Sequence, residues 1–540
     1  MNLPPRLRIA SSCLFSLVRV ALVAFVCSSA NGQTPAAPVA TTNSGKIRGY
    51  LDHGIAAFKG IPYGEDTAKH RFQPPVPPIP WGGVRDCIDF GPIAPQPISS
   101  RQRTEFFPQP KDGTVASEDC LHLNVWTPAL RDGKKRPVLF YIHGGGYSGW
   151  SSNVDVYDGV RLCQRGDVVV VTINHRLNGF GYLYLAQLGG AEYADSGNVG
   201  QLDLILALKW VRDNIAEFGG DPGCVTIFGQ SGGGAKCATL MAMPAARGLF
   251  HRVWTMSGQQ LTGRTRAHGT ETARAVLKKL GLTPERFAEI KTIPIEKLIA
   301  AMQGQSWAPV VDGGVLPRDP FAPDASPLST HIPMVMGNTH DETTYLIGGS
   351  DPSTFSLTWE SLPEKLEKAT AQFTGDLTAA QIIAEYRRLY PTYTPSDVFF
   401  AATTAARSWK GFVLQSDRRA AQPGTKTYVY YLNWRSPIDG GKWRAPHTLD
   451  IPLVFDNIAY SPTMTDNSHE AQHVARLMSD ALLAFARTGN PNTSALPTWP
   501  AYELPRRPAM IWDIKPAIEN DPRGDERNFF APAIYVQPGT

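Results

Sequence analysis

The stretch FGQSGGGAK, Phe228–Lys236, carries the strongest structural signal in this chain, because one serine stands there among four glycines. An apolar run typical of a strand, Cys224–Phe228, comes immediately before it, and a segment of small residues that can form a helix, Gly232–Met243, follows. A Gly-x-Ser-x-Gly pattern is weak alone, but at a sharp turn from strand to helix it is typical of a nucleophile elbow. The pattern therefore predicts that Ser231 is a nucleophile whose neighbours must lack bulk.

Strands and helices alternate on both sides of this stretch. Residues Leu202–Phe218 carry apolar side chains at intervals of three or four, which predicts a helix that ends at Gly219. Such alternation predicts an α/β fold with a mostly parallel central sheet and helices on both faces, in which ligands bind beyond the carboxyl ends of the strands. The other apolar runs expected to form strands are Val138–Ile142, Val168–Ile173, Val253–Met256, Pro333–Met336 and Tyr428–Leu432.

Residues 1–32 have the pattern of a signal peptide. Arg6 and Arg8 precede the apolar run Ile9–Cys27, and small residues follow that run. We expect the segment to be cleaved, which leaves a mature domain over residues 33–540 and a secreted or periplasmic protein without a stable membrane anchor. An uncleaved anchor is the alternative interpretation.

Composition argues against disorder and gives no support for a nucleic-acid partner. The chain has 540 residues, of which 42% are hydrophobic and 19% charged, as is ordinary for a soluble globular protein. Lys and Arg number 52 and Asp and Glu 48, and three of the arginines lie in the predicted signal peptide. The mature chain is thus nearly neutral, whereas nucleic-acid binding needs a concentrated basic face. The oligomeric state cannot be read from the sequence.

A second glycine-rich segment supplies what a serine nucleophile needs besides a base and an acid, namely donors for the developing oxyanion. His143 and the three glycines after it follow the expected strand Val138–Ile142. Residues without side chains can point backbone N–H groups at a substrate carbonyl, so Gly145, Gly146 and Gly232 are the predicted oxyanion hole. A simple tight turn is the alternative interpretation of the glycines.

Several ordered motifs give the chain a family resemblance. Over nearly all of its mature length it resembles the type B carboxylesterases, the cholinesterase-like branch of the α/β-hydrolases. The resemblance implies an α/β-hydrolase fold with large insertions, hydrolysis of small-molecule carboxylic esters through an acyl-enzyme intermediate, and no metal or organic cofactor. The motifs that carry it, besides the two glycine-rich segments, are Phe58–Gly64, Ser117–Leu121, Leu123–Val125, Phe218–Pro222 and Ala486–Pro491.

The family's chain order, nucleophile then acid then histidine, implies the partners of Ser231. His447 lies in a segment that resembles the family's histidine loop, whereas His469 and His473 stand four apart in a segment with helical periodicity. Those two are better interpreted as a helix face or a weak metal pair. Glu342 is the second member of an acidic pair that resembles the family's and is the predicted orienting acid, with Asp341 as its competitor.

The resemblance also implies two supporting features. Ser257 matches a serine that supports the acid in the family. Cys87 and Cys120 match a disulfide that closes a loop near the entrance to the site, and export would permit that bond. The mature chain holds five cysteines, an odd number, so at least one of them stays free or pairs with another chain.

The chain departs from the common family pattern near the predicted site without losing a catalytic group. Gln230 stands where glutamate is frequent, Gly232 where alanine is frequent, and Asn174–Asn178 where tyrosine and glycine are usual. Lys236, close after the predicted elbow, is also unusual and has no role that the sequence assigns.

The substrate is the least determined part of the prediction. A non-catalytic, cholinesterase-like binding protein and a lipase are the alternatives to a carboxylesterase. Several cations lie near the predicted entrance. They are interpreted either as solvated surface charge or as the basis of a preference for anionic esters, for example the tricarballylate esters of fumonisin mycotoxins, which some family members hydrolyse. These cations are Arg101, Arg103, Arg435, Lys442 and Arg444.

Overall fold

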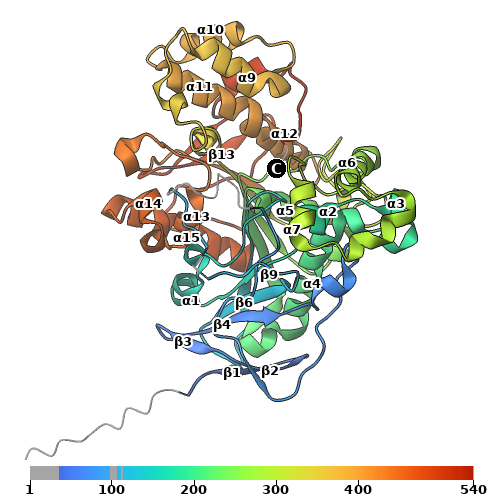
Figure 1. Ribbon diagram of the computed structural model, residues 1–540. Coiled ribbons are helices and arrows are strands. Elements are labelled where there is room, and N and C mark those ends of the chain that lie inside the picture. Colours follow the sequence, from blue (N-terminus) through green and yellow to red (C-terminus); the bar gives the residue numbers. More distant parts are fainter. Residues whose placement is uncertain (1–35, 98–105, 111–112, 539–540) are drawn as a thin grey trace, which may run out of the picture. The chain divides into compact units, whose positions relative to one another are not determined.

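An eleven-stranded sheet forms the centre of the structure, with helices on both sides of it (Figure 1). The computed structural model describes residues 36–97, 106–110 and 113–538. The predicted signal peptide, residues 1–32, lies outside the described residues. The expected α/β architecture is confirmed.

Parallel strands form the middle of the central sheet and antiparallel strands its edges. The strands of the described residues are β1 (Val39–Thr42), β2 (Gly45–Arg48), β3 (Tyr50–Asp52), β4 (Ile55–Pro62), β5 (Val84–Asp86), β6 (His122–Thr127), β7 (Arg136–Ile142), β8 (Val169–Ile173), β9 (Gly220–Gln230), β10 (Arg252–Met256), β11 (Met334–Thr339), β12 (Thr427–Leu432), β13 (Pro508–Trp512) and β14 (Ala517–Asn520). Their order in the sheet is β14-β13-β12-β11-β10-β9-β7-β8-β6-β4-β3, and β1, β2 and β5 form a separate small sheet. Pairing is parallel from β13 to β8 and antiparallel at both edges.

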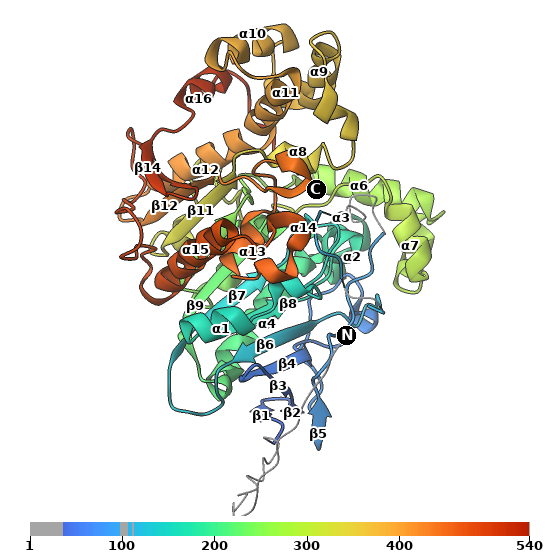
Figure 2. The ribbon, with the colours of Figure 1, turned by 90° about the vertical axis from the view of Figure 1, so that its left-hand side faces the viewer.

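Helices cover both faces of this sheet. They are α1 (Val160–Gly166), α2 (Asn178–Tyr182), α3 (Ala186–Gly189), α4 (Val199–Asn214), α5 (Gly232–Leu240), α6 (Arg266–Lys279), α7 (Ile295–Met302), α8 (Glu342–Leu346), α9 (Leu362–Thr374), α10 (Ala379–Leu389), α11 (Pro395–Thr404), α12 (Lys410–Ala420), α13 (Asp450–Val454), α14 (Pro462–Thr465), α15 (His469–Thr488) and α16 (Gly524–Phe530). Figure 1 has α1, α13 and α15 on one side of the sheet and α4 and α5 on the other, and Figure 2 brings the first group in front of β7, β8 and β9.

Alternating side chains of the strands build a separate core on each face. On β7, Leu139 and Tyr141 belong to the core that α15 covers, whereas Val138, Phe140 and Ile142 belong to the core that α4 and α5 cover. Successive side chains of a strand point to opposite faces, so a strand that is buried on both faces must be apolar throughout. This explains why the strands appear in the sequence as continuous apolar runs.

Local signals set the ends of the elements around the site. The helix expected over Leu202–Phe218 is found as α4 followed by a 3₁₀ turn, Ile215–Phe218, and it ends at Gly219, whose φ is 70°. A glycine at this left-handed position ends a helix at little cost. The next strand, β9, then runs directly into the turn that holds Ser231.

Helices α9, α10 and α11 form an insertion that packs on itself, at the top of Figure 1. Capping boxes begin two of them: Thr378 pairs with Gln381 at α10, and Thr394 with Asp397 at α11. A π-helical turn, η11 (Ala405–Trp409), joins α11 to α12. π-Helical turns are rare in proteins, and those that occur are often found at functional sites.

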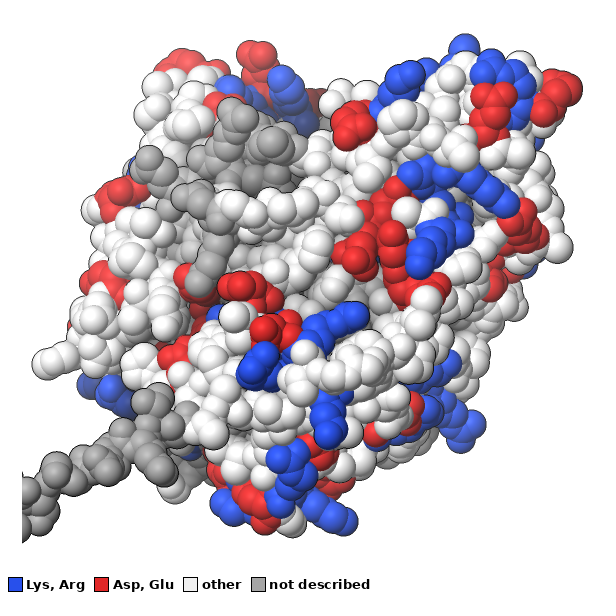
Figure 3. Space-filling view, turned by 60° about the horizontal axis from the view of Figure 1, so that its bottom comes forward, with Lys and Arg blue, Asp and Glu red and all other residues white. Residues whose placement is uncertain are grey.

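Basic and acidic side chains are interspersed on the face seen in Figure 3. This mixture agrees with the nearly neutral composition of residues 33–540. Among the described residues, no helix combines the length and the apolar character needed to cross a membrane.

The disulfide implied by the family resemblance is not formed in the structure. Cys87 and Cys120 are both unpaired and buried, and their side chains pack in the core on the α4 side of the sheet. Burial raises the pKa of Cys87 to about 12 and that of Cys120 well above its ordinary value. Both thiols therefore serve as small apolar groups, which is how buried free cysteines usually behave.

Candidate active site

Ser231 forms the sharp turn between β9 and α5. Its φ and ψ are 56° and −126°, a strained conformation for a residue other than glycine. The Ser231 N–H donates to the carbonyl oxygen of Met256 on β10 at 2.7 Å. The neighbouring strand thereby holds the turn, and the serine lines a cavity at the carboxyl ends of the parallel strands.

The glycines around Ser231 make room for the backbone of β7 and the loop after it. A Cβ on Gly233 would lie 1.9 Å from the carbonyl oxygen of Ile142, and one on Gly232 would lie 2.3 Å from that of Gly146. Neither distance is compatible with a side chain. Residue 232 is glycine where alanine is frequent in the family, and the second glycine-rich loop approaches this residue closely.

That loop, Gly144–Gly146, continues from the end of β7. Gly145 and Gly146 have φ values of 77° and 62°, which is left-handed backbone that favours glycine. Both residues line the same cavity as Ser231 and Gly232. The structure therefore brings together the three residues that the sequence assigns to an oxyanion hole.

Glu342 and His447 meet although 105 residues separate them. Glu342 begins α8, just after β11, and His447 lies in the loop that leads into α13. The Nδ1 atom of His447 and the Oε2 atom of Glu342 are joined by a buried hydrogen bond, in which the glutamate is 0% and the histidine 5% exposed. Of the two acidic candidates, Glu342 is therefore the one that touches the imidazole.

The second carboxylate oxygen of Glu342 also accepts hydrogen bonds. Its Oε1 atom accepts from the Ser257 hydroxyl at 2.5 Å and from the Thr339 N–H at 2.9 Å. Burial alone would raise the pKa of Glu342, but the charge of His447 and these hydrogen bonds outweigh it and lower the pKa below its ordinary value. Glu342 therefore stays ionised at neutral pH.

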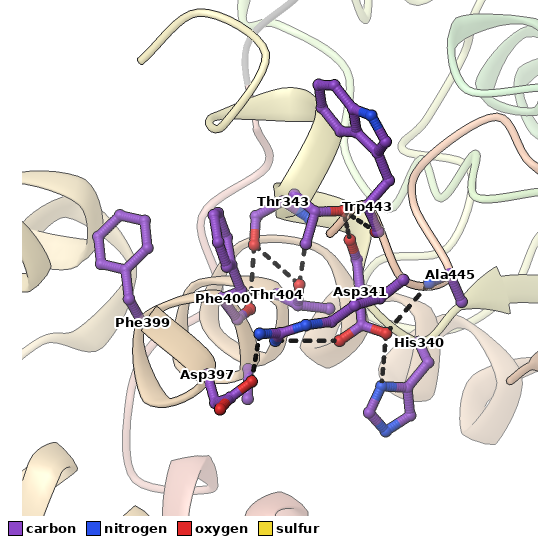
Figure 4. A network of polar contacts seen from close by, with 12 residues as sticks. His340, Asp341, Thr343, Asp397, Phe399, Phe400, Thr404, Trp443 and Ala445 are labelled. Atoms are coloured by element: carbon purple, nitrogen blue, oxygen red, sulfur yellow. Dashed lines mark hydrogen bonds and ion pairs between the residues drawn. The ribbon is translucent and has the colours of Figure 1, made fainter. Parts of the chain in front are cut away.

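Asp341 has a different place, in the network that Figure 4 shows. Its carboxylate accepts from the Ala445 N–H at 3.3 Å and lies 3.1 Å from Nδ1 of His340, while its own N–H donates to the Ala445 carbonyl at 2.9 Å. Arg444 bridges Asp341 and Asp397 of α11. Asp341 thus ties the histidine loop to the start of α8 instead of touching His447.

The cavity in front of these groups has a volume of about 450 Å³. Ser231 and His447 both line it, together with the glycine loop. Within the described residues, the Ser231 hydroxyl makes no hydrogen bond, and Nε2 of His447 instead lies 3.2 Å from the side-chain nitrogen of Gln230. Catalytic hydrogen bonds are often open in an enzyme without substrate.

Some lining residues could not have been found from the sequence. Arg407 lines the cavity from the π-helical turn η11, and Gln537 does so from the C-terminal segment. Neither belongs to a motif, and at least 40 residues separate each from His447, the predicted catalytic residue nearest to it in the chain. Only the glycine- and serine-rich side of the cavity and the loop of His447 carry a recognisable pattern.

Of the cations expected near the entrance, Lys442 and Arg444 form ion pairs and Arg435 is exposed. Lys442 pairs with Asp439 at 2.9 Å, and Arg444 pairs with Asp397 and Asp341. Arg101 and Arg103 lie outside the described residues. Arg407, which the sequence did not single out, lines the cavity itself.

The two helical histidines do not join the site. His469 is exposed at the start of α15 and His473 is half-buried one turn later. In the described part of the chain, no group of three His, Cys, Asp or Glu side chains is arranged to hold a metal ion. The interpretation of these histidines as part of a helix face agrees with their positions.

Comparisons with known proteins agree with this geometry. The model of the carboxylesterase family matches residues 36–530. A para-nitrobenzyl esterase of Bacillus subtilis is 34% identical over 92% of this chain and 99% of its own, and a phenmedipham hydrolase of Pseudarthrobacter oxydans is 31% identical over 86% and 93%. The crystal structure of a carboxylesterase from Geobacillus stearothermophilus superposes with a TM-score of 0.79 at 37% identity, over 91% of this chain and 99% of its own. The chain therefore belongs to the carboxylesterase family and is a carboxylic ester hydrolase with the α/β-hydrolase fold.

Proposed function

We propose that Ser231, His447 and Glu342 form a catalytic triad that hydrolyses carboxylic esters through an acyl-enzyme. The observation that supports this most is their arrangement around one cavity. Ser231 and His447 line it with the glycine loop, and Glu342 holds the far nitrogen of His447. This is the set of groups that acyl transfer by a serine requires.

In the first half of the proposed reaction, Nε2 of His447 takes the hydroxyl proton of Ser231 while Oγ forms a bond to the ester carbonyl carbon. The N–H groups of Gly145, Gly146 and Gly232 donate to the resulting oxyanion. When the carbon–oxygen bond of the ester breaks, His447 returns the proton to the departing alcohol. The acyl group then remains on Ser231.

In the second half, water repeats the attack. His447 accepts a proton from the water, the hydroxide oxygen bonds to the acyl carbon, and the proton returns to Oγ of Ser231 as the acid departs. Glu342 stabilises the imidazolium in both halves because it is ionised and paired with Nδ1. The contact between Gln230 and Nε2 of His447 must open before the serine can transfer its proton.

Covalent labelling tests this assignment. A fluorophosphonate should add one phosphonyl group to the protein, and peptide mass spectrometry should locate it on Ser231. Ser231→Ala is the matched control and should stay unlabelled while its melting temperature remains close to that of the wild type. A folded wild-type protein that takes no label would favour the non-catalytic binding protein and overturn the proposal.

We further propose that the preferred esters carry a carboxylate, as the tricarballylate esters of fumonisin do. Among the described residues that line the cavity, Arg407 is the only permanently charged side chain, and no Asp or Glu lines it. An anionic acyl group bound beside Ser231 would find a favourable charge there. A neutral substrate would gain nothing from it.

Matched esters test this preference. We expect the wild type to have a several-fold higher kcat/KM for a tricarballylate monoester than for a neutral ester of equal size, and added salt should reduce the difference. Arg407→Gln should remove the preference mainly through KM. Equal kcat/KM values without a salt effect would contradict the proposal, and a preference for emulsified long-chain esters would favour a lipase.

We also propose that the protein is exported. The support is the charge and apolar pattern of residues 1–32. The intact mass of the protein recovered from the periplasm or medium should lack this segment, and a full-length mass in a membrane fraction would indicate an anchor instead.

A further inference from the structure

We propose that Lys236 is a positioning residue of the esterase site, which fixes the loop Gly144–Gly146 by holding both of its ends. The inference rests on the proposed role of this loop as an oxyanion hole. It assigns a function to a lysine that stands five residues after Ser231, in a helix that begins at the nucleophile.

The contacts of Lys236 define this role. Its Nζ atom donates to the carbonyl oxygen of His143 at 3.2 Å and lies 5.6 Å from the centroid of the Tyr147 ring. His143 is the residue directly before the three glycines, and Tyr147 is the residue directly after them. One ammonium group therefore contacts both ends of the loop.

The same face of α5 makes a second tie to the loop. Thr239 lies three residues after Lys236, on the same side of the helix. Its hydroxyl, which donates to the Ala235 carbonyl at 2.9 Å, lies 3.3 Å from the Tyr147 hydroxyl, and the Tyr147 hydroxyl donates to Oε1 of Gln260 at 3.1 Å. The helix that begins at the nucleophile thus also holds the loop that carries the predicted oxyanion donors.

The surroundings of Lys236 contain no compensating carboxylate. Its side chain is 0% exposed, and in the described residues no Asp or Glu forms an ion pair with it. The titratable groups that face it are His143, His175, Tyr147 and the Cys237 thiol. Beyond His175, Arg176 is paired with Asp203.

Lys236 is thus a buried basic group without an acidic neighbour among the described residues. Burial lowers the pKa of Lys236 to about 7. Burial, and then the charge of Lys236, lower the pKa values of His143 and His175, whose neutral rings stack with centroids 4.8 Å apart. A buried lysine without a counter-ion is costly to stability, whether it keeps its charge or gives up its proton, so packing alone explains this lysine poorly.

Fixing the loop matters because oxyanion donors accelerate the reaction only when they are oriented before the charge develops. Gly145 and Gly146 have left-handed backbone and no side chains that could hold them. Anchors at His143 and Tyr147 supply the rigidity that the glycines lack. Loss of Lys236 should therefore weaken transition-state binding more than substrate binding.

Kinetics of Lys236→Met test the proposal, because methionine fills a similar volume without a donor. We expect kcat to fall about 10- to 100-fold with KM changed less than threefold. The inhibition constant of a trifluoromethyl ketone, whose hemiketal oxyanion occupies the hole, should rise by a similar factor. Lys236→Gln keeps a donor and should recover part of kcat.

Lys59→Met is the matched control. Lys59 on β4 is also a buried lysine, 7% exposed, with its Nζ atom 4.6 Å from the centroid of the Phe90 ring, and it does not line the cavity. This variant should lower the melting temperature but leave kcat and the inhibition constant unchanged. A generic cost of removing a buried lysine would instead affect both variants alike.

The outcomes separate this inference from the proposed function. If Lys236→Met keeps kcat and the inhibition constant within twofold of the wild type, the inference is overturned, while fluorophosphonate labelling of Ser231 would still support the triad. If the Lys236 variants do not fold, Thr239→Val removes the second tie, and we expect kcat to fall about threefold. Unchanged kcat in that variant would overturn the inference as well.

Discussion

The hydroxyl of Ser257 donates to Oε1 of Glu342 at 2.5 Å, while Oε2 of the same carboxylate pairs with His447. Ser257 follows β10 and Glu342 follows β11, so the contact joins the ends of two neighbouring parallel strands. The carboxylate is thereby held on both sides before a substrate arrives.

Ser257→Ala should lower kcat about three- to tenfold with little change in KM, because one donor that stabilises the ionised Glu342 is lost while the Thr339 N–H remains. Steady-state kinetics on a soluble ester would measure this. Ser479→Ala, which removes a buried hydroxyl on α15, is the control and should leave kcat unaltered. Equal effects of both substitutions would speak against a role of Ser257 at the acid.

Glu342→Gln and Asp341→Asn should separate the acid from its neighbour. Glu342→Gln removes the charge that stabilises the imidazolium, so kcat should fall about 10³-fold. Asp341→Asn should lower the melting temperature, because the Arg444 network loses a charge, but kcat should fall less than tenfold. The reverse ranking of the two kcat values would make Asp341 the orienting acid.

Gln230→Glu should move the acidic limb of the pH–rate profile to higher pH. The amide nitrogen of Gln230 lies 3.2 Å from Nε2 of His447, and a carboxylate there would stabilise the imidazolium, which cannot act as a base. We expect a shift of about one pH unit in kcat/KM. Gln259→Glu places a carboxylate elsewhere in the cavity and should shift the limb less.

Asp450→Asn should change how stability depends on pH. Burial, and then the charge of Glu342, raise the pKa of Asp450 to about 7, while the Tyr430 hydroxyl donates to Oδ2 at 2.9 Å. The unfolded chain releases this proton near pH 4, so the free energy of unfolding of the wild type falls between pH 4 and 7, by about 4 kcal/mol. Asparagine has no proton to release, and the melting temperature of the variant relative to the wild type should therefore rise from pH 5 to pH 8.

Denaturation curves at several pH values would measure this difference. The comparison at pH 5 is the internal control, because folded Asp450 is neutral there and resembles the asparagine. Parallel pH dependences of the wild type and the variant would show that Asp450 does not titrate in this range.

The parts of the fold that could be predicted are those where local chemistry decides. Cys224–Phe228 had to form a strand and Ser231 a strained turn, because apolar β-branched residues and flanking glycines leave few other conformations. The sheet order could not be predicted in the same way. The neighbours β7 and β9 are separated in the sequence by β8 and α4, and their pairing depends on packing between distant segments.

The residue types of the proposed triad were visible in the sequence, but their contacts were not. Asp341 and Glu342 are adjacent and chemically alike, and only the direction of the first turn of α8 places one carboxylate on His447 and the other on Ala445. The disulfide is the opposite case. The family resemblance implied a bond between Cys87 and Cys120, yet in the structure both thiols pack unpaired in the core.

The sequence by itself determined the fold class, the sharp turn at Ser231 and the glycine-rich loop Gly144–Gly146, because each depends on backbone conformations that neighbouring residues impose. Only the tertiary structure decided that Lys236 contacts both ends of that loop and that Arg407 reaches the cavity. Both are single long side chains on helices, and what a long side chain reaches depends on which distant segments pack against its helix.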